Sequence, residues 1–226
     1  MKRYRWLLGC CLFLSIGMLW AADEPDLRML QQKAAQSRDM EGYVGVCKYL
    51  YQTEENPELL LLYADSIHQL ATKSKKPEQL VEYYIWASEG NFIKGDFQQG
   101  YALKRKAIAL AEKAGLKFAI SQSCCDMGYY CNVDARYDSA RYYFRKGLEA
   151  GEDLSEAGEA CRTMLTNYAS SFLFEGKTDS ALVYTIRASE RSAADKDTAM
   201  LIENLNQLGT IYRRKKDLEN CIANFE

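Results

Sequence analysis

The chain has 226 residues, of which 48% are hydrophobic, 12% aromatic and 27% charged, a composition too apolar for a disordered protein. Its single histidine, His68, excludes any zinc site that uses two histidine ligands. No stretch alternates apolar and polar residues, which argues against a sheet-dominated fold. The formal net charge of −2 gives no electrostatic reason to bind nucleic acid.

Residues 1–22 have the pattern of a secretory signal peptide. Three of the first five residues are basic, residues 6–20 carry no charge, and Ala21 and Ala22 precede an acidic pair. The apolar stretch is shorter than the roughly 20 residues that span a bilayer, and an uncleaved short anchor is the alternative. We expect export, with cleavage after Ala21 or Ala22. Because the leader holds three basic residues and no acidic one, the mature chain carries a net charge of −5.

Residues 23–80 predict helices without a clear repeat. Glu41–Glu54 and Pro57–Lys73 have helical apolar spacing, but they lack the small residues that mark the later part of the chain. The three prolines, Pro25, Pro57 and Pro77, stand at predicted helix starts, where the missing amide proton costs nothing. We interpret this segment as a degenerate or capping repeat, because terminal repeats of helical arrays are commonly atypical.

From Val81 onward the sequence repeats one unit four times. In each copy a small residue precedes a second small residue by 12 positions, and successive copies are displaced by about 40 residues. Apolar residues at i, i+3, i+4 and i+7 predict one stripe on a helix. The paired small residues are Ser88 and Gly100, Gly128 and Ala140, Ala169 and Ala181, and Gly209 and Cys221.

Each copy therefore predicts a helical hairpin. The small residues let the two backbones approach closely, and a further small residue seven positions on lets the next hairpin stack. These further residues are Ala107, Gly147 and Ala188. An acid stands at the start of each second helix, where it can cap free amides and meet the positive end of the helix dipole. The four acids are Asp96, Asp138, Asp179 and Asp217.

This spacing resembles the tetratricopeptide repeat (TPR) family, whose pattern is W-x2-L-G-x2-Y, then A-x3-F, then P. The positions that match are Gly128, Ala140, Phe144, Ala181, Gly209, Tyr212 and Phe225. The chain departs from the family because every copy lacks the tryptophan and the terminal proline, and because its period exceeds the roughly 34 residues of the family pattern. The resemblance implies an all-α fold, namely a right-handed α-solenoid of TPR-like helical hairpins.

The expected organisation follows from these patterns. Residues 1–22 form the signal peptide, residues 23–80 the degenerate or capping repeat, and residues 81–226 the TPR-like repeats. The repeats occupy 81–120, 121–161, 162–201 and 202–226, and the last is incomplete. Because a solenoid needs a polar end cap, the apolar stripe expected on the last helix indicates either that the natural protein continues beyond Glu226 or that this is a truncated gene product.

The cysteines of the mature chain are expected to be structural. An even count in an oxidising compartment is compatible with disulfides. Three of them fall where a helical repeat places a mid-sized apolar residue, and a free cysteine packs as a small hydrophobe. We therefore expect burial rather than a disulfide framework for Cys47, Cys124, Cys125, Cys131, Cys161 and Cys221.

No catalytic constellation is evident in the sequence. His68 has no partner in a nucleophile pattern, and we expect a surface or half-buried helical histidine. The basic run Arg213–Lys216 closes a predicted helix and is interpreted as a solvated helix end. No phosphate-binding loop, nucleophile elbow or dinucleotide fingerprint occurs. We expect a protein that is not an enzyme, with no cofactor and no metal site.

The resemblance also implies a groove. In TPR proteins the first helices line a concave groove that receives peptides or partner helices, and the matching positions in this chain are apolar at the centre, with an acidic and a basic end. The expected groove residues are Glu89, Phe92, Tyr129, Val133, Leu173, Phe174 and Arg213. The groove is expected to hold either a protein or peptide partner or the later part of the same protein.

The expected function is a non-catalytic protein–protein interaction module that does not bind nucleic acid. By analogy with some Gram-negative regulators, it is expected to be the N-terminal extracytoplasmic sensory part of a longer membrane signalling protein. The alternative is a free periplasmic or envelope adaptor that scaffolds protein assembly. Both place the chain in the periplasm or cell envelope of a Gram-negative bacterium.

Overall fold

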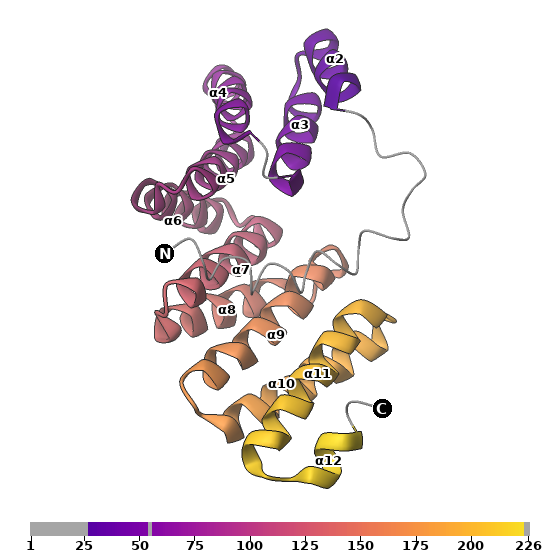
Figure 1. The fold of residues 1–226 in the computed structure, drawn as a ribbon. Coiled ribbons are helices and arrows are strands. Elements are labelled where there is room, and N and C mark those ends of the chain that lie inside the picture. The colour runs from indigo at the N-terminus through magenta and orange to yellow at the C-terminus, as the bar shows by residue number, and fades with distance from the viewer. Residues whose placement is uncertain (1–26, 54–55, 224–226) are drawn as a thin grey trace. The chain divides into compact units, whose positions relative to one another are not determined.

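The computed structural model describes residues 27–53 and 56–223, which fold into α-helices joined by short turns and contain no β-strand (Figure 1). The described helices are α2 (Leu27–Ser37), α3 (Met40–Thr53), α4 (Pro57–Ser74), α5 (Pro77–Lys94), α6 (Phe97–Ala114), α7 (Lys117–Val133), α8 (Tyr137–Gly151), α9 (Gly158–Phe174), α10 (Thr178–Ala194), α11 (Thr198–Lys215) and α12 (Leu218–Ala223), with a short 3-10 helix, η1, at Ser155–Ala157.

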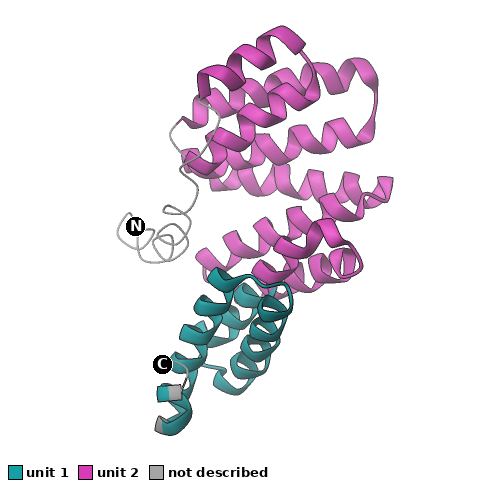
Figure 2. Ribbon diagram, turned by 90° about the vertical axis from the view of Figure 1, so that its right-hand side faces the viewer, with its two compact units in different colours: residues 1–25, 165–226 teal, residues 26–164 magenta. Residues whose placement is uncertain are grey.

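The chain divides into two compact units (Figure 2). Unit 2 comprises residues 26–164 and holds α2 to α8 with the start of α9. Unit 1 comprises residues 165–226 with 1–25, and its described helices are the rest of α9 and α10 to α12. In unit 2 each helix from α2 to α7 packs against the helix that follows it, and α3 also contacts α5. In unit 1, α10 packs on α11 and α11 on α12. The expected fold class, an all-α solenoid of helical hairpins, is confirmed.

The helices follow the period of the sequence. The first helices of the four repeats, α5, α7, α9 and α11, begin at Pro77, Lys117, Gly158 and Thr198. The helices predicted in residues 23–80 are also confirmed, because α3 and α4 begin and end within one residue of the expected bounds. Pro57 and Pro77 occupy the first turns of α4 and α5, as expected. A helix start was also predicted at Pro25, and the described helix α2 begins two residues further on, at Leu27.

The turn between α5 and α6 has the chemistry that a sharp reversal needs. Gly95 adopts a φ of +92°, in the left-handed region that glycine enters without a steric penalty, and its N–H donates to the carbonyl of Phe92 at 3.1 Å. Asp96 follows directly, and its carboxylate accepts a hydrogen bond from the backbone N–H of Gln99 at 3.1 Å. The capping role predicted for Asp96 is therefore confirmed.

The other predicted caps divide into two groups. Asp217 accepts a hydrogen bond from the backbone N–H of Asn220 at 3.2 Å, as a cap does. Asp138 and Asp179 instead lie inside the first turns of α8 and α10, where they pair with Arg141 and Lys215. The capping prediction was wrong for these two acids, because each helix begins one residue earlier than the acid. Both acids still stand in the first turn, near the positive end of the helix dipole, as predicted.

The small residues allow close helix contacts in unit 2. A Cβ atom added to Gly128 on α7 would overlap the ring of Phe144 on α8, so the phenylalanine fills the space that a side chain would occupy. Gly147 on α8 lies equally close to the side chain of Met164 on α9. These contacts confirm the two predicted roles of small residues, one within a hairpin and one between successive hairpins.

The predicted burial of the cysteines is confirmed for five of the six. Cys47, Cys124, Cys125, Cys131 and Cys161 are buried free thiols, while Cys221 is half-buried. Burial raises the pKa of Cys47 and of Cys124 to about 12. Very little of either side chain is thiolate at neutral pH, so these thiols act as packing groups.

The signal peptide and Pro25 lie outside the described residues, as does the last predicted match, Phe225. Across the described ranges, no helix combines the length and the apolar character needed to cross a bilayer.

The glycine contact generates a stability prediction. Gly128→Ala is expected to lower the free energy of unfolding by about 1–3 kcal/mol, because the new methyl group must displace the packed ring of Phe144. Gly45→Ala in α3 is the matched control, since its added Cβ meets only Leu30 at 3.9 Å, and its greater helix propensity should stabilise by up to about 1 kcal/mol. Urea unfolding followed by circular dichroism measures both, and equal effects would contradict the packing role.

Candidate interaction surface

The seven predicted groove residues do not form one open surface. Val133 and Phe174 are 40% and 46% exposed, Arg213 is exposed and Tyr129 is half-buried. Glu89, Phe92 and Leu173 are only 2%, 0% and 7% exposed, so the prediction that they line an open groove was wrong.

Phe92 is buried because it forms the centre of an aromatic cluster between α5, α6 and α7. Its ring stacks on Tyr130 with a centroid distance of 3.6 Å and meets the edge of Tyr101 at 5.2 Å. It also fills the space beside Gly100, where a Cβ atom would lie 2.7 Å from the ring. Phe92 therefore fills the space beside the small residue Gly100 in the first repeat, as Phe144 fills the space beside Gly128 in the second. Phe92 lies on the first helix of its hairpin, whereas Phe144 lies on the second.

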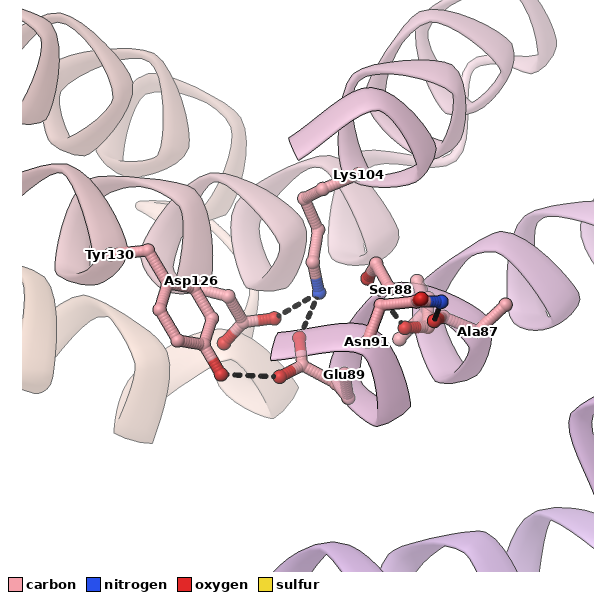
Figure 3. A network of polar contacts seen from close by, with 8 residues as sticks. Ala87, Ser88, Glu89, Asn91, Lys104, Asp126 and Tyr130 are labelled. Atoms are coloured by element: carbon pink, nitrogen blue, oxygen red, sulfur yellow. Dashed lines mark hydrogen bonds and ion pairs between the residues drawn. The ribbon is translucent and has the colours of Figure 1, made fainter. Parts of the chain in front are cut away.

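Glu89 is buried because it takes part in a polar network that joins the same three helices (Figure 3). Lys104 reaches from α6 between Glu89 on α5 and Asp126 on α7. Its Nζ forms an ion pair with Glu89 and lies 2.9 Å from Oδ2 of Asp126. The hydroxyl of Tyr130 donates to Oε2 of Glu89 at 2.9 Å.

The network is unequal in charge, because one ammonium serves two carboxylates. Burial alone would lower the pKa of Lys104, but the two carboxylates outweigh it and raise the pKa well above its usual value. Burial raises the pKa of the Glu89 carboxyl, since Lys104 is shared with Asp126 and offsets only part of the cost of removing Glu89 from water. When both carboxylates are ionised, the network carries one negative charge in excess.

Helix α3 adds an aromatic group to this side of the unit. Tyr51 on α3 meets the ring of Trp86 on α5 edge-on, with a centroid distance of 6.3 Å, and the indole N–H of Trp86 donates to Oε2 of Glu82 at 2.9 Å. The charge of Glu89, together with burial of the hydroxyl, raises the pKa of Tyr51 well above its usual value. The α3–α5–α7 face is defined here as Tyr51, Glu82, Trp86, Glu89, Asp126 and Tyr129.

The sequence contained one signal for the buried network that was not used. The second-helix pattern small-x3-aromatic reads Ala140-x3-Phe144 and Cys221-x3-Phe225, but in the first repeat Gly100 is paired in this pattern with Lys104. A charge at a core position of a repeat requires a buried partner. That requirement would have indicated a counter-charge on the neighbouring first helices, where Glu89 and Asp126 lie.

The helices of unit 1 are joined by neutral polar contacts. Asn204 on α11 donates to Ser192 on α10 at 3.1 Å, and Thr166 on α9 donates to Asn204 at 2.9 Å. Gln207 donates to Ser170 at 2.7 Å. In these contacts of unit 1, amide and hydroxyl groups join neighbouring helices, whereas the network around Lys104 in unit 2 joins its helices through charged groups.

The basic run at the end of α11 is partly engaged. Arg214 donates to the carbonyl oxygen of Leu173 at 2.9 Å, and Lys215 pairs with Asp179. Arg213 and Lys216 are exposed. The interpretation of this run as a solvated helix end holds for these two residues, whereas Arg214 and Lys215 tie α11 to its neighbours.

His68 has the surface position that the sequence predicted. It is exposed on α4, and its ring stacks on Tyr83 of α5 with a centroid distance of 4.3 Å. Within the described residues, no three histidine, cysteine or acidic side chains gather as metal ligands do.

The buried ammonium generates a second stability prediction. Lys104→Met is expected to lower the free energy of unfolding by about 3–5 kcal/mol, because Glu89 stays buried without its counter-charge. Lys113→Met in the same helix is the control, since Lys113 is exposed, and it should change stability by less than about 1 kcal/mol. The double variant with Glu89→Leu should recover much of the loss in urea titrations; no recovery would show that the pairing is not the source.

One buried carboxyl group, that of Glu89, and two half-buried ones, those of Glu82 and Glu203, generate a pH prediction. Burial raises the pKa of Glu82, Glu89 and Glu203, so each group binds its proton more tightly in the folded than in the unfolded chain. Their contribution favours folding at low pH and is lost as pH rises through the raised pKa values. The free energy of unfolding should therefore increase as pH falls from 7 toward 4.5, the usual glutamate pKa, and the variant Glu82→Gln/Glu203→Gln should flatten the profile. A fall in stability over this interval would contradict the assignment.

Comparison with known proteins identifies the fold but no family. No protein-family model matches the chain, and no curated protein matches it. Among solved structures, BtubC (BKLC) from P. vanneervenii is similar with a TM-score of 0.67 and 13% identity, covering 88% of this chain and 83% of that one. At this identity the likeness extends to the helical fold alone.

Proposed function

We propose that this chain is a non-catalytic, TPR-type protein-interaction module that acts outside the cytoplasmic membrane, as the N-terminal sensory part of a longer membrane signalling protein. The observation that carries the proposal is the presence of exposed apolar and aromatic side chains at the ends of first helices. Val133 at the end of α7 and Phe174 at the end of α9 are 40% and 46% exposed. Exposed large apolar groups on a solvated scaffold are typical of binding surfaces.

Three further features support the proposal. The helix starts recur about every 40 residues, as a hairpin array requires. The contact between Gly128 and Phe144 places the glycine and aromatic positions of the TPR pattern against each other. The basic start and uncharged stretch of residues 1–20 favour export.

Site-specific photocrosslinking in living cells tests the interaction role. A photoreactive amino acid placed at Val133 in unit 2, or at Phe174 in unit 1, should give discrete adducts with a partner protein, because each side chain is exposed at the end of a first helix. The matched control is Val183, which is 63% exposed but lies on a second helix, α10, and should give none. Adducts at Val183 alone, or at none of the three positions, would contradict the proposal.

Export and the sensory role are tested separately. The product isolated from the periplasm should begin at Ala22 or Asp23 by N-terminal sequencing, and a cytoplasmic product that begins at Met1 would contradict export. The reading frame past Glu226 should continue into a spanning helix and an output domain. A stop codon within one helix length would instead favour a free envelope adaptor.

A further inference from the structure

The α3–α5–α7 face of unit 2 holds more negative than positive charge. Glu82, Glu89 and Asp126 contribute three carboxylates, whereas Lys104 is the one buried ammonium among them. Glu82 is hydrogen-bonded by the neutral indole of Trp86, and the exposed Lys48 on α3 also acts on its charge, which leaves three carboxyl groups to two lysines. A charge held away from water without a counter-charge is costly, so this face favours any cation that reaches it.

Part of the face is accessible to a ligand. The side chain of Asp126 is 22% exposed, although Lys104 holds its Oδ2 atom. Tyr51 is 37% exposed, and its hydroxyl makes no hydrogen bond to the described residues. Glu89 and Asp126 both act on that hydroxyl, and their charges raise the pKa of Tyr51. An incoming cation would therefore meet an aspartate oxygen and a tyrosine ring whose polar end has no partner among the described residues.

The structure already contains one site of this kind in the same unit. The guanidinium of Arg136 lies over the ring of Tyr101, 4.3 Å from its centroid, and the Tyr101 hydroxyl donates to Asp134 at 2.7 Å. Arg136 and Asp134 are 3.9 Å apart. Here a tyrosine ring and an aspartate bind an arginine of the same chain. Tyr51 and Asp126 are the same two residue types on the α3–α5–α7 face, but no hydrogen bond joins them as one joins Tyr101 to Asp134.

The chemistry of the face favours an organic cation over a metal ion. The Lys104 ammonium already lies between Glu89 and Asp126, and it repels a divalent cation about twice as strongly as it repels a guanidinium at the same distance. A guanidinium is planar, so it can stack on a tyrosine ring while its N–H groups donate to a carboxylate. A lysine ammonium cannot make both contacts in this way.

We propose that the α3–α5–α7 face binds an arginine side chain of a partner protein, with the guanidinium stacked on Tyr51 and hydrogen-bonded to Asp126. This inference rests on the proposed interaction role and names the chemistry of the partner at one place. The acidic residues give the face its preference for a cation, and the aromatic rings give it the preference for arginine.

Trp86 provides a local probe for the test. It is the only tryptophan after residue 20, and it contacts Tyr51 on this face. The whole chain with Trp6→Phe and Trp20→Phe therefore reports this face alone through its tryptophan fluorescence. Titration with a capped tetra-arginine peptide should change the signal and saturate, tetra-lysine should bind at least about 3-fold more weakly, and tetra-glutamate should not bind.

Variants show whether the named residues carry the binding. Asp126→Asn should weaken tetra-arginine binding about 10-fold or more, and Tyr51→Leu about 3-fold or more. Asp65→Asn on α4 removes an exposed charge away from the face and should leave the dissociation constant within about 2-fold. If Asp126→Asn does not fold, as judged by circular dichroism, Tyr51→Leu carries the test because Tyr51 is partly exposed.

Several results would overturn the proposal. They are the absence of tetra-arginine binding, an equal loss with Asp65→Asn, equal affinity for tetra-lysine, or the same fluorescence change with calcium chloride alone. Crosslinks at Val133 and Phe174 together with any of these results would leave the interaction role standing and remove only the arginine site. The absence of both crosslinks and peptide binding would remove both proposals.

Discussion

One buried ammonium determines how the first repeat is assembled. Lys104 joins α6 to α5 through Glu89 and to α7 through Asp126, so a single side chain connects a hairpin to the one that follows it. Tyr130 extends the connection, because its hydroxyl binds Glu89 while its ring stacks on Phe92. Ionic and aromatic contacts are therefore combined in one layer, and neither can shift without moving the other.

A purely apolar layer would have served stability equally well, because the gain from a buried ion pair rarely exceeds the cost of removing its ions from water. The second repeat shows this solution, with Phe144 packed beside Gly128. The first repeat differs by placing two carboxylates around one cation. The consequence is a face that is rich in carboxyl groups and includes the partly exposed ring of Tyr51, which is a property suited to recognition rather than to packing.

Periodicity carried most of the fold prediction. The spacing of small residues predicted where the hairpins begin. A close contact such as that of Gly128 with Phe144 leaves no room for a larger side chain, so a small residue recurs at this position of the repeat. Asp96 was predictable as a cap for a similar local reason. Asp138 and Asp179 were not, since a one-residue change in where a helix begins moves an acid from the cap into the first turn.

The candidate site was less predictable, because burial depends on neighbours that repeat positions do not encode. Phe92 and Glu89 occupy groove positions by resemblance, yet both are enclosed through partners far along the chain, such as Tyr130.

The most direct measurement is a thermodynamic cycle that links this chain to its ligand. It compares a peptide with one arginine to the same peptide with citrulline, each bound to the natural chain and to Asp126→Asn. Because the two groups are inferred to touch, the affinity losses should be non-additive, with a coupling free energy of about 1.5 kcal/mol or more. Strictly additive losses would show that Asp126 and the arginine do not interact, and they would contradict the account.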